Sequence, residues 1–114
     1  MGSLSDHFDE REFACACCGE VVVEPGLVDV LEDVRRHFGK PVTVQSGYRC
    51  AAHNADVGGA TYSQHLYGKA ADIVVKDTDP SEVQDYLREH AGGLGSYTSF
   101  THVDVRGYTA RWKG

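Results

Sequence analysis

Apolar residues recur at helical spacing in two segments of the chain and form short uninterrupted runs elsewhere. The helical spacing predicts helices over residues 25–38 and 80–90, each with a proline in its first turn. The short apolar runs predict strands over residues 21–23, 42–44, 70–75, 95–97 and 100–106. Residues 46–61 show no clear period, which indicates a long irregular segment.

The order of these elements indicates an α+β protein. Strands that are not separated by regular crossover helices favour a small antiparallel or mixed sheet with helices packed on one side. The 114 residues are enough for one compact domain and leave little room for a second. We therefore expect one α+β domain over residues 1–114, a small antiparallel sheet with flanking helices, with the first dozen residues as a weakly ordered lead-in.

Composition and charge exclude several classes of protein. Apolar residues make up 41% and charged residues 25% of the chain, ordinary values for a globular protein. No apolar run approaches the roughly 18 residues that a membrane span needs. The 17 acidic residues outnumber the 11 basic ones, for a net charge of −6. Nucleic-acid binders usually carry the opposite sign, so a DNA or RNA partner is disfavoured.

Asp72 stands inside an otherwise apolar strand run, and His65 precedes it by seven positions in a glycine-rich loop. An ionised aspartate in such a strand is costly to bury without a partner. That partner is either a nearby lysine, arginine or cluster of backbone N–H groups, or a metal ion.

Alternation along the predicted strand 100–106 puts His102, Asp104 and Arg106 on one face. This face is either a solvated surface with an Asp104–Arg106 pair or the floor of a cleft. Together with the histidine and aspartate above, His102 completes a set of two imidazoles and one carboxylate. These are the donors of a catalytic zinc site, which leaves its fourth position to water and lowers the pKa of that water to about 7. The set therefore points towards hydrolysis.

Six ordered and well-spaced segments carry a resemblance to a known family. They are Ser46-Gly47-Tyr48-Arg49, His53-Asn54, Val57-Gly58-Gly59-Ala60, Ser63-Gln64-His65 with Gly68, Ala71-Asp72-Ile73, and Phe100-Thr101-His102-Val103-Asp104. Over residues 27–112 the chain resembles the zinc D-Ala-D-Ala carboxypeptidases, which are related to lysostaphin-type peptidases and the hedgehog domain. The resemblance implies a zinc peptidase acting on bacterial cell-wall peptides, with an antiparallel sheet that carries the metal.

The resemblance also implies roles for individual residues. The positions that match the zinc ligands, for one zinc ion per chain, are His65, Asp72 and His102. Arg49 matches the arginine that contacts a substrate carboxylate or polarised carbonyl, a role that suits a fixed, bidentate guanidinium. The alternative for Arg49 is a structural salt bridge. Ser63 and Gln64 are expected to support the substrate or the first histidine ligand by hydrogen bonding.

The general base is the point at which this sequence departs from the family pattern. Several relatives carry an acid three positions before the last zinc histidine, where this chain has Ser99. Others carry a His-x-His pair, which is His102-x-Asp104 here. Asp104 is therefore the candidate catalytic base, and its alternative role is to orient His102 by hydrogen bonding.

Four cysteines form a separate group, with Cys15, Cys17 and Cys18 clustered and Cys50 further along the chain. Three states are open: a disulfide between Cys50 and one of the others, a structural metal with His53 completing a Cys-x-x-His step, or reduced buried thiols. The missing signal segment favours reduced thiols over disulfides.

The sequence thus predicts a zinc peptidase that cleaves peptidoglycan peptides as a D,D-carboxypeptidase or an endopeptidase. We expect a monomer without a membrane span. Because the N-terminus has neither a basic nor an apolar region, we expect no secretory signal, and a cytoplasmic or phage-encoded enzyme such as an endolysin that acts on the cell wall after release. The alternatives are a non-catalytic zinc-binding interaction domain of the same fold and a cysteine-stapled interaction module.

Overall fold

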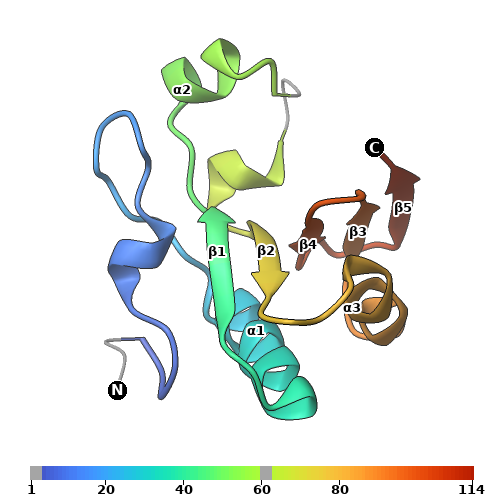
Figure 1. Cartoon of the computed structure of the whole chain (residues 1–114). Coiled ribbons are helices and arrows are strands. Elements are labelled where there is room, and N and C mark those ends of the chain that lie inside the picture. The colour runs from blue at the N-terminus through green and yellow to red at the C-terminus, as the bar shows by residue number, and fades with distance from the viewer. Residues whose placement is uncertain (1–3, 60–62) are drawn as a thin grey trace.

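The computed structural model describes residues 4–59 and 63–114 (Figure 1). Its α-helices are α1 (Pro25–Phe38), α2 (Ala51–Asp56) and α3 (Pro80–Leu87), and its 3-10 helices are η1 (Glu10–Phe13) and η2 (Gln64–Tyr67). Its strands are β1 (Val42–Ser46), β2 (Ala70–Val75), β3 (Gly93–Ser96), β4 (Thr101–Asp104) and β5 (Ala110–Lys113). No helix within the described ranges has the length and apolar character needed to cross a membrane.

The strands form a single five-stranded sheet in the order β1-β2-β4-β3-β5. The first three pairings are antiparallel, and β5 joins β3 as a parallel edge strand. The expected α+β class with a small, mostly antiparallel sheet is confirmed. The sequence pattern does not predict β5, because Arg111 and Lys113 alternate with apolar residues over only four positions.

Both predicted helices form. α1 has the predicted bounds and ends at Gly39, whose φ of 64° is the left-handed conformation that glycine adopts without strain. Its buried face includes Leu27, Leu31 and Val34. α3 begins after Asp79, whose side chain accepts a hydrogen bond from the N–H of Ser81, and it ends at Leu87, before its predicted limit of residue 90.

Two predictions of local structure are wrong: the strand at residues 21–23 and the irregular segment at residues 46–61. Residues 21–23 form no strand: Val22 is 43% exposed, and the N–H of Glu24 donates to the carbonyl of Gly68 at 2.9 Å rather than to a strand ladder. The segment 46–61 contains α2, which the sequence pattern does not indicate. Residues 60–62, with Ala60 of one family motif, lie outside the described residues.

Of the segment expected to be a weakly ordered lead-in, the described residues 4–12 pack onto the domain. Phe8 is 1% exposed, and its ring lies 6.2 Å from that of Phe13. Burying one such side chain contributes about 1.5–3 kcal/mol. The hydroxyl of Ser5 and the N–H of His7 donate to the carboxylate of Glu32 on α1. Burial raises the pKa of Glu32, but these hydrogen bonds outweigh it and hold the pKa below its ordinary value.

Alternation along β2 and β4 separates the core from the opposite face of the sheet. Ala71, Ile73 and Val103 belong to the core, which α1 and α3 cover. Neighbouring side chains in a strand point to opposite faces, so Asp72 and His102 lie on the face away from these helices. The antiparallel register sets these two residues directly opposite each other. Figure 1 shows α2 and η2 at one end of β1 and β2, with the N-terminal segment alongside β1.

Candidate metal centre

Three buried side chains converge on the face of the sheet away from the helices. His65 Nε2 lies 3.3 Å from Asp72 Oδ1, and His102 Nδ1 lies 3.1 Å from the same oxygen. One potential ligand atom from each residue lies within 4.8 Å of the other two. Burial raises the pKa of Asp72, but hydrogen bonds from His102 and His65 outweigh it and keep the pKa well below its ordinary value. The structure therefore brings the three ligands proposed from the sequence together around an ionised carboxylate.

His65 owes its position to the short helix η2. The side chain of Ser63 caps this helix by accepting a hydrogen bond from the N–H of His65 at 3.3 Å. Gly68 ends it with a φ of 68°, and a Cβ at Gly68 would overlap the main chain of Val22. The close approach of residues 21–23 thus explains why a glycine follows this histidine.

Each histidine has its outer ring nitrogen held by an acceptor. His65 Nδ1 donates to the carbonyl oxygen of Gly47 at 2.7 Å, and its Nε2 faces Asp72. His102 Nε2 lies 2.9 Å from Asp104 Oδ2, so its Nδ1 faces Asp72. Metal-binding histidines almost always donate their second N–H to a carbonyl or carboxylate in this way. Two imidazoles and one carboxylate so arranged fit a zinc ion with an open coordination position.

Asp104 lies behind His102, on the side of the ring away from Asp72. Its fully buried carboxylate accepts hydrogen bonds from the N–H of Gly93 at 2.9 Å and from Arg106 Nε and Nη2 at 2.9 and 2.7 Å. Burial raises the pKa of Asp104, but bonds from His102 and Arg106 outweigh it and keep the pKa well below its ordinary value. So weak a base, facing the outer nitrogen, is poorly placed to take a proton at the open side of the site. The geometry favours the orienting role for Asp104 over the catalytic one.

Arg49 reaches the same site from the loop between β1 and α2. Its Nη2 lies 3.4 Å from Asp72 Oδ2, and its Nε and Nη1 contact Ser46 Oγ at 3.3 Å and Asn54 Oδ1 at 3.4 Å. All three contacts are long. They orient the guanidinium towards the site, but none of them is a short bidentate salt bridge. Because the side chain is 16% exposed, it remains available to an anionic group from solvent.

A cavity of about 420 Å³ opens over these residues. Its lining comprises Arg49, Gly58, Gly59, Ser63, Gln64, His65, Asp72, Tyr97, Phe100, His102, Arg106 and Trp112. Ser63 and Gln64, the predicted substrate contacts, therefore lie beside the candidate ligands. Among the described residues of this lining, Asp72 is the one carboxylate, so no separate acidic base faces the cavity there.

Aromatic side chains form one wall of the cavity. Tyr97 stacks on Phe100 with ring centroids 4.3 Å apart, and Trp112 Nε1 donates to the Tyr97 hydroxyl at 3.1 Å. The Trp112 ring lies 4.9 Å from that of His102 and covers Gly95, where a Cβ would approach the indole to 2.6 Å. Sequence reasoning missed this wall because Trp112 lies on the unpredicted β5. The feature of the sequence that could have indicated this wall is Trp112 itself, the single tryptophan of the chain.

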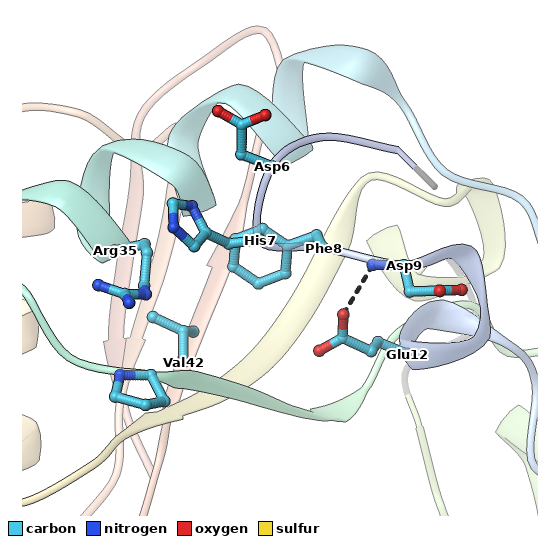
Figure 2. A pocket seen from close by; sticks show the side chains of 8 residues that line it. Asp6, His7, Phe8, Asp9, Glu12, Arg35 and Val42 are labelled. Carbon is cyan, nitrogen blue, oxygen red and sulfur yellow. Dashed lines mark hydrogen bonds between the residues drawn. The ribbon is translucent and has the colours of Figure 1, made fainter. Parts of the chain in front are cut away.

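A second cavity of about 420 Å³ lies at the N-terminal segment (Figure 2). Asp6, Arg35 and Val42 line it together with Asp9 and Glu12, and the N–H of Asp9 donates to Glu12 Oε2 at 2.7 Å. This hydrogen bond belongs to the cap of η1. Within the described parts of the chain, no group of three metal-ligating side chains lies in this hollow. This second cavity therefore offers no candidate metal site among the described residues.

A family comparison covers most of the chain. The model of the family described as peptidase M15 matches residues 6–104. The chain belongs to the peptidase M15 family. This match confirms the family expected from the sequence motifs, and its range includes the three candidate ligands and Asp104.

A relative within this family carries a name that bears on function. The zinc D-Ala-D-Ala carboxypeptidase of Streptomyces albus G is 48% identical to the chain over 80 residues. The aligned stretch covers 64% of this chain and 31% of that protein. The chain thus corresponds to about a third of the length of the curated relative that it matches.

Proposed function

We propose that this peptidase M15 family member is a zinc-dependent peptidase that cleaves peptidoglycan peptides. The observation that carries the proposal is the convergence of His65, Asp72 and His102 at one cavity, with the outer nitrogen of each histidine held by an acceptor. The zinc D-Ala-D-Ala carboxypeptidase that matches the chain supports both the metal and the class of substrate.

Zinc would be held by His65 Nε2, His102 Nδ1 and a carboxylate oxygen of Asp72. When bound, zinc lowers the pKa of a coordinated water and polarises a carbonyl, which together promote hydrolysis of a peptide bond. The protein's part is to keep both rings in the correct tautomer and orientation. The carbonyl of Gly47 does this for His65, and Asp104 does it for His102.

Arg49 favours carboxypeptidase over endopeptidase activity. Its guanidinium reaches the cavity and can bind a carboxylate through two parallel hydrogen bonds. A peptide that ends in a free carboxylate offers such a group next to its last peptide bond. The substrate of an endopeptidase does not. The aromatic wall of Tyr97, Phe100 and Trp112 would shield the bound peptide from water on the other side.

Digestion of purified muropeptides by the zinc-loaded protein tests this proposal. Mass spectrometry should detect loss of a terminal D-alanine from pentapeptide stems, whereas cleavage of cross-linked dimers would identify an endopeptidase. His65→Ala should abolish product formation. His90→Ala is the matched control and should retain activity, because His90 is exposed and stacks on Tyr86 outside the cavity.

Two outcomes would contradict the proposal. If the zinc-loaded protein cleaves no muropeptide, it is a non-catalytic zinc-binding domain of this family. If His65→Ala cleaves muropeptides as fast as the unmodified protein, the chemistry lies elsewhere.

A further inference from the structure

Three of the four cysteines of the chain gather outside the catalytic cavity, with Cys17 beside them on the same turn. One ligand atom each from Cys15, Cys18 and Cys50 lies within 4.8 Å of the other two. The Cys17 thiol lies within hydrogen-bonding reach of the Cys50 side chain. All four are free thiols, of which Cys15 is buried, Cys50 is half-buried, and Cys17 and Cys18 are exposed.

A tight turn presents three of these sulfurs. The N–H of Gly19 donates to the carbonyl of Cys15 at 2.8 Å, and the N–H of Cys15 donates to the carbonyl of Glu20 at 2.8 Å. Gly19 closes the turn with a φ of 76°, a conformation that favours glycine. Cys15 and Cys18 therefore stand on one turn at the Cys-x-x-Cys spacing that is common in structural zinc sites. The run Cys-x-Cys-Cys conceals this spacing in the sequence.

Backbone N–H groups point at the sulfurs of this cluster. The N–H of Cys50 donates to Cys15 Sγ at 3.4 Å, and the N–H of His53 donates to Cys50 Sγ at 3.5 Å. Burial raises the pKa of the Cys15 thiol, but hydrogen bonds from the N–H groups of Cys50, Cys18 and Cys17 outweigh it and lower the pKa to about 6. These bonds favour the Cys15 thiolate, and the thiolate is the form of cysteine that binds metals, whereas the neighbouring cysteines raise the pKa of Cys17 and of Cys18.

We propose that Cys15, Cys17, Cys18 and Cys50 form a second metal site, which holds one structural zinc ion. Structural zinc is bound tetrahedrally by four ligands at about 2.3 Å for sulfur, which sets the sulfurs about 3.8 Å apart. Cys15, Cys18 and Cys50 already have their ligand atoms within 4.8 Å of one another, and rotation of the exposed Cys17 side chain would bring in the fourth sulfur. Soft thiolate ligands select zinc over magnesium or calcium, and a cation offsets the cost of bringing several thiolates together.

This second site would join the N-terminal segment to the loop that serves the catalytic cavity. Cys50 caps α2 and directly follows Arg49 in the chain. Just before it, the N–H of Tyr48 donates to the carbonyl of Phe13 at 2.9 Å, and Gly47 packs against the Phe13 main chain so closely that a Cβ would approach it to 2.6 Å. The metal would hold the stretch that carries both Arg49 and the Gly47 carbonyl, whatever reaction the cavity performs.

Metal content of the protein, purified anaerobically with zinc and then dialysed, tests the proposal. The unmodified chain should hold two zinc ions, and His65→Ala should hold one. The double variant Cys17→Ser/Cys18→Ser should also hold one, and because both side chains are exposed it should still fold. After exchange of zinc for cobalt(II), a thiolate-to-cobalt charge-transfer band should appear in the unmodified chain and in His65→Ala but not in the double variant. The histidine site has no sulfur, so this band reports the cysteine site alone and does not depend on peptidase activity.

Three results would overturn the proposal. A titration of fewer than four thiols in denaturant would show a disulfide in place of a metal site. Four thiols, one zinc ion in the unmodified chain and no charge-transfer band in His65→Ala would show a reduced cluster without metal. Loss of the band in His53→Ala would assign the fourth position to His53 instead of Cys17. Because His65→Ala keeps all four cysteines, it tests the site even if the double variant fails to fold.

Discussion

Replacing Asp104 with asparagine separates the two roles that this residue can have. The carboxylate accepts from His102 Nε2 at 2.9 Å, so that Nδ1 is the ring nitrogen that would lose its proton and bind a metal. Asparagine keeps the shape but replaces one acceptor oxygen with an NH2 group. If the amide nitrogen faces His102, the imidazole accepts at Nε2 and carries its proton on Nδ1, the atom that must bind the metal. If the amide oxygen faces His102, the amide nitrogen meets the donors Gly93 N–H and Arg106 Nε instead.

The geometry gives a magnitude for each effect. Loss of the acceptor behind a zinc-binding histidine lowers metal affinity about 10- to 100-fold, or about 1.4–2.8 kcal/mol. Removing one partner of a buried ion pair costs about 3–5 kcal/mol of folding free energy. The lower end applies here, because the Arg106 side chain is 17% exposed and retains some contact with water. We therefore expect Asp104→Asn to bind zinc more weakly and unfold more easily, with turnover largely restored when zinc is saturating.

Three measurements test this expectation: competition for zinc with a chromogenic chelator, denaturant unfolding, and turnover of muropeptide across a zinc titration. Asp85→Asn is the matched control: Asp85 is exposed and pairs with the exposed Arg88 just after α3, so its loss should change neither zinc affinity nor turnover. A general base contributes about 10²- to 10⁴-fold to the rate. If Asp104→Asn binds zinc normally yet loses at least about a hundredfold in turnover at saturating zinc, the orienting role is refuted and Asp104 is the base.

Other substitutions test further parts of the structure. Gly93→Ala places a Cβ against the Asp104 carboxylate, so a zinc titration should show an affinity as weak as that of Asp104→Asn. An unchanged affinity would mean that β3 moves to make room for the methyl group without displacing Asp104. Arg49→Lys should keep zinc but lose catalytic efficiency, because a point charge cannot form two parallel bonds to a carboxylate; unchanged kinetics with a lower Tm would identify a structural role. Glu32→Gln should lower stability by about 1–3 kcal/mol at neutral pH. Because folding lowers the pKa of Glu32, the stabilisation by this carboxylate is complete above the ordinary glutamate pKa and is lost as the pH falls through the folded value. The unfolding free energies of the variant and the unmodified protein should therefore converge in acid. A difference that persists in acid would contradict this.

Local patterns predict the elements that local interactions stabilise. The helical period and the initial proline specify α1, and a run that is apolar apart from Asp72, buried at five of its six positions, specifies β2. The same reasoning fails for residues 21–23. This apolar triplet packs against Gly68 and does not pair with a strand of the sheet. The reasoning also fails for β5, which forms through hydrogen bonds to β3 and not through its own pattern. Strand pairing is a non-local interaction, so a short segment cannot reveal it by composition.

The sequence by itself determined the family, the fold class and the residues of the candidate metal centre, because a histidine, an aspartate and a second histidine stand in motifs whose spacing matches known relatives. Only the tertiary structure decided which nitrogen of each histidine faces the centre, and that Asp104 lies behind His102 with Arg106 and Gly93 bound to it. Strand alternation places Asp104 and His102 on one face but does not say which ring nitrogen the carboxylate meets. That choice depends on groups from β3 and the end of β4 that occupy the space around the carboxylate. It also took the folded chain to bring Cys50 beside the turn that carries Cys15 and Cys18, since the contact joins segments 35 residues apart.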